Sequence, residues 1–347
     1  SIARGADSLL FFRWRTCRFG AEEYWCGILD HDNVPRRRYE EVKQLGEELK
    51  AVGPEILGTH VHVDVGIACA DVDVYDAHDT MSLGLPSPKE VARELHAYLL
   101  EEGYAVGCVH PSDDLSDLKL YVIPHWALFH PNWVPNLTTY VENGGLLVIG
   151  ARTATKSWYN NVVAQTPPGV LSQLARVQVE EYGRQNAPDK RPLTLRFYPG
   201  TERVHTKHWY EQVSGLPGTK TLARWSHRSP SGSGRHLNLK TAITLRSLGE
   251  GAVVYVGTYL NAELMAALMA RLKEQREDLA PLWAAPEGVQ VVLREGAGKR
   301  LWFFINNNDL GVSLHDVPEG TELIRGKSGE KRVFLNRYGV AIIKEEV

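Results

Sequence analysis

The feature that most constrains this sequence is the apolar run at residues 9–12, LLFF, which Arg13, Trp14 and Arg15 follow directly. A continuous apolar run predicts a strand buried on both faces, as in a parallel sheet or a barrel. In a (β/α)8 barrel, ligands bind where the strands stop and the loops begin, so polar and aromatic residues at that point indicate a binding site. A core strand followed by two solvated arginines fits the same local pattern.

The residues that follow complete one strand, loop and helix unit. The loop carries Glu22, Glu23, Tyr24 and Trp25, and residues 36–50 place apolar side chains at helical spacing: Tyr39, Val42, Leu45 and Leu49. A parallel strand requires parallel neighbours, and nothing before residue 1 supplies them. We therefore expect residues 5–25 to include the last strand of a barrel whose other strands lie outside this sequence.

Composition excludes several classes of protein. The 347 residues are 43% hydrophobic and 23% charged, with a formal net charge of −3, which is ordinary for a globular protein of two or three domains. This balance argues against nucleic-acid and membrane partners, and no apolar run reaches the ~20 residues that span a bilayer. No signal peptide is visible. The four cysteines lack CxxC spacing, which predicts reduced structural thiols in a cytoplasmic protein, without a zinc or redox motif.

The middle of the chain alternates strand and helix patterns after a boundary that we place near residue 58. The predicted strands are residues 61–70, 104–109, 118–124, 146–150 and 252–256, and the predicted helices are residues 88–102, 132–143 and 262–273. Short turns marked by glycine connect them, which indicates an open, mostly parallel α/β sheet with a flavodoxin-like strand order. Residues 192–240 are rich in turns and short strand patterns, with a flexible tip at residues 229–234.

The last segment alternates without a helical pattern. Residues 286–347 contain the stretches VQVVLRE, KRLWFFINNN and KRVFLNRYGVAIIKEE, separated by turn residues. Short strands of this kind predict a small antiparallel β domain.

Together these segments resemble the C-terminal portion of glycoside hydrolase family 42, the β-galactosidases. The opening GADSLLFFRWRTCRFGAEEYW resembles the family's G-A-D, F-R-W-R and G-A-E signature, and YVENGGLLVIGARTATK and LWFFINNN extend the likeness along the chain. The resemblance implies three domains. Residues 1–58 are the truncated C-terminal end of the catalytic TIM barrel, residues 59–285 a flavodoxin-like (glutaminase-like) α/β trimerisation domain, and residues 286–347 the small C-terminal β domain.

The resemblance also implies a function. The family is a group of retaining enzymes that hydrolyse terminal non-reducing β-D-galactosides, with two catalytic glutamates on the fourth and seventh barrel strands. Both positions lie upstream of residue 1, so we expect no catalytic acid/base or nucleophile in this chain, and no activity from the segment alone. The implied partners are a galactoside substrate and two further copies in a homotrimer. No cofactor and no metal is expected in this segment.

Three residues are the candidates for contact with substrate. Glu22 matches the glutamate of the G-A-E signature, which accepts hydrogen bonds from sugar hydroxyls; a carboxylate discriminates hydroxyl stereochemistry because such bonds are short and directional. Trp25 stands where many family members have a sugar-binding histidine, so either stacking on a sugar ring or simple packing fits it. Trp14 lies at the strand end, where it either walls the pocket or fills the barrel core.

Other functions fit less of the sequence. A non-catalytic assembly or carbohydrate-binding module is the competing class, since the catalytic carboxylates are missing. His60, His62 and Asp64 alternate on a predicted strand as metal ligands do, but a polar strand face explains them equally. A glutaminase requires a Cys or Ser on a tight elbow after a strand, whereas Ala151, Arg152 and Thr153 follow the strand at residues 146–150. The GSG at residues 232–234 is not placed between a strand and a helix, as a phosphate loop would be.

Overall fold

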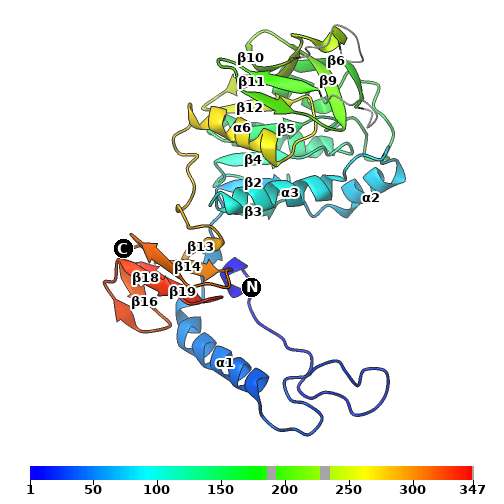
Figure 1. Ribbon diagram of the computed structural model, residues 1–347. Helices are drawn as coiled ribbons and strands as arrows, with labels where there is room; N and C mark the ends of the chain where they lie inside the picture. Colours follow the sequence, from blue (N-terminus) through cyan, green and yellow to red (C-terminus); the bar gives the residue numbers. More distant parts are fainter. Residues whose placement is uncertain (186–192, 227–234, 346–347) are drawn as a thin grey trace. The chain divides into compact units, whose positions relative to one another are not determined.

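The computed structural model describes residues 1–185, 193–226 and 235–345, and these residues form two compact units. One unit comprises Ser1–His62 together with Leu282–Val347, and the other comprises Val63–Pro281 (Figure 1). The first division of the chain therefore falls a few residues beyond the boundary expected near residue 58. The predicted tip at residues 229–234, including the GSG, lies outside the described residues.

A nine-stranded sheet forms the centre of the unit Val63–Pro281. Five parallel strands, β2 (Val65–Ala68), β3 (Val106–Val109), β4 (Leu120–Ile123), β5 (Leu146–Gly150) and β12 (Gly251–Val256), lie in the order β3-β2-β4-β5-β12. Numbered along the chain this order is 2-1-3-4-5, the flavodoxin-like arrangement that the alternation predicts. Four antiparallel strands continue the sheet beyond β12, namely β11 (Thr241–Leu248), β10 (Thr219–Trp225), β7 (Thr194–Phe197) and β8 (Arg203–His205).

The antiparallel half is larger than the sequence suggested. The turn-rich region predicted at residues 192–240 contributes β7, β8, β10 and the long strand β9 (Trp209–Gly215), which pairs with β6 (Val177–Arg184) in a separate two-stranded sheet. Each of these strands is short or half-buried, so its apolar pattern is weaker than that of the fully buried parallel strands.

Helices cover both faces of the parallel strands. On one face α3 (Pro88–Glu101) and α6 (Ala262–Lys273) bury Leu95 and Leu268 in a core with Ile67 and Val148. On the other face α2 (Val72–Thr80) and α4 (Val134–Glu142) share a second core with Tyr121 and other residues of the sheet. Shorter helical segments are η2 (Pro131–Trp133), η3 (Gly169–Leu171), α5 (Ser172–Ala175) and η4 (Arg235–Leu237). The alternation of buried residues between the two cores follows from the two-residue period of a strand.

Helix α3 shows why the sequence placed some elements well. Ser87 and Glu90 form a reciprocal capping box at its start, with Pro88 at the first helical position. Gly103 follows its end with φ +82°, the left-handed conformation that glycine adopts without strain. Helix α2 was missed because its nine residues lack a clear apolar periodicity, although Asp71 caps it.

The other unit is built on a six-stranded sheet. Its order is β1 (His60–Val61), β13 (Val289–Gly296), β14 (Lys299–Asn306), β19 (Val340–Glu345), β16 (Gly320–Glu322) and β17 (Lys327–Ser328). A second pair, β15 (Val312–His315) and β18 (Arg332–Leu335), packs its buried side chains with one face of this sheet. The expected antiparallel strands at the end of the chain are therefore present.

The opposite face of this sheet carries the start of the chain. Ala3 of η1 (Ile2–Arg4) and Val52 and Ile56 of α1 (Arg37–Ile56) share a core with Leu301 and Phe303 of β14. Two segments that we expected in different domains thus belong to one compact unit. The predicted strand at residues 61–70 is divided, because β1 pairs with β13 in this unit whereas β2 belongs to the other sheet.

The strand predicted at residues 9–12 is not formed in the structure. These residues have no ladder partner in the described chain, and Leu10 and Phe12 are 97% and 73% exposed. The physical reason is that a parallel strand exists only through hydrogen bonds to its neighbours. Among the described residues, no helix has the length and apolar character needed to cross a bilayer.

Candidate functional site

The loop after residues 9–12 is held in shape by backbone pairing with a later part of the same loop. Ile28 and Leu29 donate backbone hydrogen bonds to Arg13 O (2.9 Å) and Trp14 O (2.8 Å), and Thr16 N donates to Leu29 O (3.0 Å). The buried Thr16 hydroxyl joins the two segments again, accepting from Gly27 N (2.8 Å) and donating to Leu29 O (3.2 Å). The residues between these segments, 17–26, therefore form a closed loop.

Gly27 is required where the two segments of this loop meet. A Cβ at this position would lie 2.7 Å from the backbone of Arg15 and Thr16, closer than real Cβ contacts. Glycine thus permits the close approach of the two backbones. The polar loop that the sequence predicts is present in the structure, although the strand before it is not formed.

Glu22 lies on this closed loop and forms an ion pair with Arg13. The Glu22 side chain is 47% exposed whereas that of Arg13 is 18% exposed, so the arginine anchors the carboxylate and leaves part of it open. Arg13 is therefore not a solvated arginine, and its guanidinium also lies 4.9 Å from the centroid of the Phe12 ring.

The two candidate tryptophans are both exposed. Trp14 is 62% exposed and its ring contacts Tyr39 of α1 edge to face, with centroids 6.1 Å apart. Trp25 is 59% exposed, and its backbone N–H donates to Glu22 O (3.1 Å) in the turn that carries Glu22. The turn therefore brings Glu22 and Trp25 together through the backbone, while Trp14 is adjacent to Arg13, the partner of Glu22.

Sequence reasoning missed a buried polar network at the carboxyl ends of the parallel strands, where ligands bind in folds of this type. The turn after β5 places Arg152 at φ 64°, and its guanidinium donates to the Tyr259 hydroxyl (2.9 Å) and lies over the Trp209 ring. His125, which follows β4, is fully buried and stacks on Tyr259 with centroids 3.9 Å apart. Protein side chains therefore pack against one another directly after β4 and β5.

Glu211 of β9 is the carboxylate of this network. It accepts hydrogen bonds from the Tyr255 hydroxyl (2.7 Å), Trp209 Nε1 (3.1 Å) and Arg152 N (3.1 Å). Burial raises the pKa of the Glu211 carboxyl, and these hydrogen bonds oppose that shift. Burial alternates along β9 in the structure and places Glu211 on the inward side, but the stretch WYEQVSG carries no sequence pattern that predicts it.

His125 is held as a neutral ring. Its Nδ1 lies 2.9 Å from Ala151 O, and its Nε2 accepts from Leu260 N at 2.9 Å, which together assign the proton to Nδ1. Burial lowers the pKa of His125 to about 3. The arrangement is that of a packed interior rather than a proton-transfer site open to substrate.

The glutaminase alternative finds no nucleophile at this position. Arg152 occupies the left-handed position of the turn after β5, and the hydroxyl of the adjacent, fully buried Thr153 donates to Gly150 O (2.7 Å). The metal alternative finds no cluster either. His62 pairs with Glu295 (2.6 Å) and Asp64 with Lys119 (2.8 Å), and no group of three His, Cys, Asp or Glu within the described part of the chain is placed to hold a metal ion.

Comparisons with known proteins agree with the fold. Three family models match in order along the chain: the β-galactosidase model of glycoside hydrolase family 42 at residues 1–52, the β-galactosidase trimerisation domain at residues 68–280, and the β-galactosidase C-terminal domain at residues 288–345. Together these matches cover almost the whole sequence. The chain belongs to the β-galactosidases of glycoside hydrolase family 42.

Curated relatives align over the same span. A β-galactosidase of Clostridium cellulovorans is 28% identical over 347 residues, which cover 99% of this chain and 50% of the relative. A β-galactosidase of the archaeon Haloferax lucentense is 29% identical over 94% of this chain and 46% of its own length. The chain thus spans about half the length of the curated relatives that it matches.

Solved structures show the same fold. The β-galactosidase from Bacillus circulans superposes with a TM-score of 0.89 at 19% identity, covering 99% of this chain and 50% of that one. The β-galactosidase from the Antarctic haloarchaeon Halorubrum lacusprofundi gives a TM-score of 0.80 at 24% identity, over 99% and 48% of the two chains. The fold of this chain is therefore that of the matching half of these β-galactosidases.

Proposed function

We propose that this chain is the C-terminal part of a retaining β-galactosidase that hydrolyses terminal non-reducing β-D-galactosides. Residues 1–58 supply one wall of the sugar pocket, and the α/β unit supplies the oligomerisation domain. The catalytic acid/base and nucleophile belong to a part of the enzyme outside this sequence, so the segment alone is inactive. The observation that carries the proposal is the half-exposed Glu22 carboxylate, fixed by Arg13 on a loop closed by backbone pairing.

The proposed role of Glu22 is to accept hydrogen bonds from hydroxyls of the galactosyl group. The carboxylate has four lone-pair directions, and Arg13 occupies only part of them. Charge-assisted hydrogen bonds from two neighbouring hydroxyls are directional, so a fixed carboxylate distinguishes the axial hydroxyl of galactose from an equatorial one. Trp25, in the same turn, offers an exposed ring to the apolar face of a pyranose, and Trp14 extends this aromatic wall.

The exposed apolar side chains beside this loop support the assignment to a barrel. Leu10, Phe11 and Phe12 are all at least 48% exposed, which is unusual for large contiguous apolar residues. Neighbouring barrel strands and helices would cover them and would convert the run into the strand that its sequence predicts. The same exposed run predicts that the isolated segment aggregates.

The expected assembly is a homotrimer. The description of the family model matched at residues 68–280 supports this stoichiometry, since it is a trimerisation domain. Sedimentation equilibrium of the full-length protein measures it, and a monomeric or dimeric mass contradicts the assignment. We place the enzyme in the cytoplasm and assign it no cofactor.

Substitution of Glu22 in the full-length enzyme tests the proposed site. We expect Glu22→Ala to lower kcat/KM for an aryl β-galactoside by about 10²-fold, because hydrogen bonds to charged groups contribute roughly 1.5–3 kcal/mol and strengthen in the transition state. Glu22→Gln retains the shape of the side chain but loses its charge, so we expect its kcat/KM to lie between that of the parent and that of Glu22→Ala. Glu23→Gln is the matched control, since Glu23 is the adjacent carboxylate of the same loop, and it leaves the kinetics unchanged.

Unchanged kinetics for Glu22→Ala, with an unchanged melting temperature, would exclude Glu22 from the sugar site.

The alternative function is a non-catalytic assembly or carbohydrate-binding module. It predicts that the coding sequence begins at or near Ser1 and that galactosides bind without turnover, and this result would remove the proposed activity. An upstream reading frame that carries two glutamates at strand ends contradicts that alternative.

A further inference from the structure

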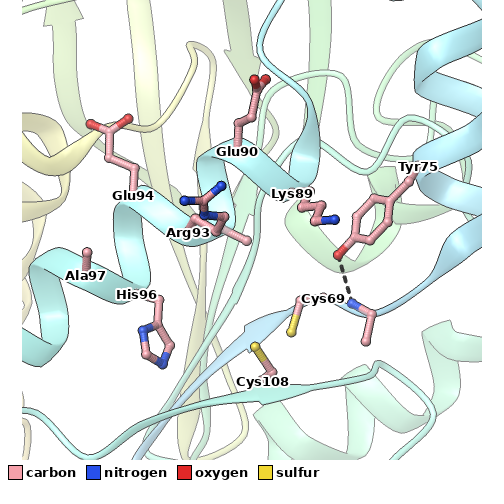
Figure 2. Close-up of a pocket in the computed structure, with 11 residues that line it drawn as sticks. Cys69, Tyr75, Lys89, Glu90, Arg93, Glu94, His96, Ala97 and Cys108 are labelled. Carbon is pink, nitrogen blue, oxygen red and sulfur yellow. Dashed lines mark hydrogen bonds between the residues drawn. The ribbon is translucent and has the colours of Figure 1, made fainter. Parts of the chain in front are cut away.

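The carboxyl ends of β2 and β3 bring two cysteines together that lie 39 positions apart in the sequence. In the parallel pair β2 and β3, Ile67 is opposite Cys108, and Cys69 follows Ile67 by two residues on the same side of the sheet. Figure 2 shows the two sulfur atoms facing each other. β2 ends at Ala68, so Cys69 lies beyond the ladder, where Ala70 turns the chain at φ 67° and is held by a hydrogen bond to the Tyr75 hydroxyl (2.8 Å).

The two thiols differ in accessibility. Cys108 is exposed, whereas Cys69 is buried with 7% of its surface accessible. The hydrogen bond from Cys69 lowers the pKa of Cys108 to about 7, against the effect of burial. The same hydrogen bond, with burial added, raises the pKa of Cys69. Cys108 is therefore the nucleophile of the pair, and Cys69 is a thiol that only its neighbour can reach.

Both cysteines line a hollow of about 960 Å³ beside α3, a size typical of small-molecule sites. Lys89 and Arg93 of α3 line the same hollow. Glu90 and Glu94 line it as well, but their carboxylates are held by hydrogen bonds from Ser87 N and Ala262 N. In the part of the chain that the structure describes, neither Lys89 nor Arg93 has an ion-pair partner. Two uncommitted cations beside a reactive thiol favour a ligand that carries carboxylates.

We propose that Cys69 and Cys108 form a thiol pair that reacts with carboxylate-bearing low-molecular-weight disulfides, of which glutathione disulfide is the probe. The Cys108 thiolate attacks one sulfur of the probe, which forms a mixed disulfide and releases one glutathione thiolate. The Cys69 sulfur then attacks the Cys108 sulfur, and its proton passes to the second glutathione as that thiol leaves. The protein gives up two electrons and gains one disulfide, and one glutathione disulfide is reduced to two thiols.

This proposal adds a reaction to two of the four cysteines, which the sequence predicts to be reduced structural thiols and which are free in the structure. The absence of CxxC spacing was a valid observation, but it tests only pairs that are close in sequence. The flavodoxin-like order places β2 beside β3 with α2 and α3 between them in the chain, so the two cysteines meet only in the folded sheet.

The test is treatment of the full-length protein with glutathione disulfide at pH 7, followed by peptide mapping without reduction. We expect the Cys69–Cys108 disulfide to accumulate with little glutathione retained on Cys108. Cys108 reacts about three-fold faster than an ordinary exposed thiol, because its larger thiolate fraction outweighs its lower nucleophilicity. Cys26, exposed in the same chain, is the internal reference.

Two sets of variants separate the steps. In Cys69→Ser the mixed disulfide on Cys108 persists, and in Cys108→Ser Cys69 stays unmodified. Lys89→Gln with Arg93→Gln slows the reaction with glutathione disulfide by about three-fold per charge and leaves that with uncharged 2-hydroxyethyl disulfide unchanged. A mixed disulfide that persists on Cys108 while Cys69 is intact, or a Cys108 that reacts more slowly than Cys26, overturns the proposal. Equal slowing with both disulfides overturns the assigned ligand class.

Discussion

Two apolar runs of similar composition have opposite fates in this protein. Residues 9–12, LLFF, are exposed and form no strand, whereas β5, LLVIG, is fully buried between β4 and β12. Both runs predict a strand covered on both faces. The difference is that β5 has parallel neighbours on each side and helices over each face, while the run at residues 9–12 has none within the described chain. An apolar run therefore predicts that a segment needs to be buried. Whether it is buried, and whether it forms a strand, depends on the segments beside it.

A carboxylate substituted into each run tests this comparison directly, and the buried run gives the largest effect. Val148→Asp in β5 places a carboxylate at a side chain with no solvent exposure, so we expect the α/β unit to lose about 5 kcal/mol or more of its free energy of unfolding. Leu10→Asp, at a residue that is 97% exposed, changes that free energy by less than about 0.5 kcal/mol in this chain.

Urea denaturation of the chain measures both variants. If Leu10→Asp destabilises as strongly as Val148→Asp, residues 9–12 are buried and the comparison fails. In the full-length enzyme the proposed barrel covers Leu10, and the same substitution is then expected to be severe.

The buried ring of His125 provides a second test of the comparison. Burial shifts the pKa of this ring in the α/β unit, whereas the N-terminal loop is exposed. The pKa of His125 is lowered to about 3 by burial, with smaller contributions from the charges of Arg152, His208 and His78. A lowered histidine pKa means that the unfolded chain binds the proton more readily, so stability is fully present above pH ~6.5 and is lost as the pH falls toward 3.

Between pH 6 and pH 4, His125 alone removes about 2.5 kcal/mol of the free energy of unfolding. Protonation also breaks the hydrogen bond from Leu260 N to Nε2. His125→Gln does not titrate, so its stability changes less over this interval. Equal slopes for the two proteins in urea titrations at a series of pH values would show that the ring does not contribute.

The smallest effect concerns the part of the N-terminal segment that is ordered. Thr16→Val keeps the shape of the side chain but leaves Gly27 N–H without its acceptor, at a cost of about 1–2 kcal/mol to the closed loop. Faster amide hydrogen exchange at Gly27 and Leu29 reports this loss, while exchange in β5 stays the same. Thr16→Ser retains the hydroxyl and is expected to match the parent. Unchanged exchange in Thr16→Val would mean that backbone pairing alone closes the loop.

Some elements followed from the sequence because their signals are local. The capping box at Ser87 and Glu90, the apolar period of α6 and the glycines after β strands and helices each depend on residues a few positions apart. The sequence did not define the antiparallel strands β7, β8 and β10, because half-buried strands have weaker apolar patterns. It did not predict helix α2, because that helix lacks a clear apolar periodicity.

The candidate site divides in the same way. Glu22, Trp25 and Trp14 were found from a contiguous stretch, and the structure adds that Arg13 holds Glu22 and that a turn joins Glu22 to Trp25. The network around Glu211 of β9 joins the turn after β5 to β12, and no local pattern connects these residues. Their partnership depends on the order of the strands.

The sequence by itself determined the family, the flavodoxin-like alternation and the carboxylate-bearing loop, because motifs and periodicities are properties of neighbouring residues. Only the tertiary structure decided that the run at residues 9–12 stays uncovered, that Arg152 and His125 close the end of the sheet, and that Cys69 meets Cys108. Each of these outcomes depends on which strands lie side by side, and strand pairing is set by the burial of the whole sheet rather than by any one segment.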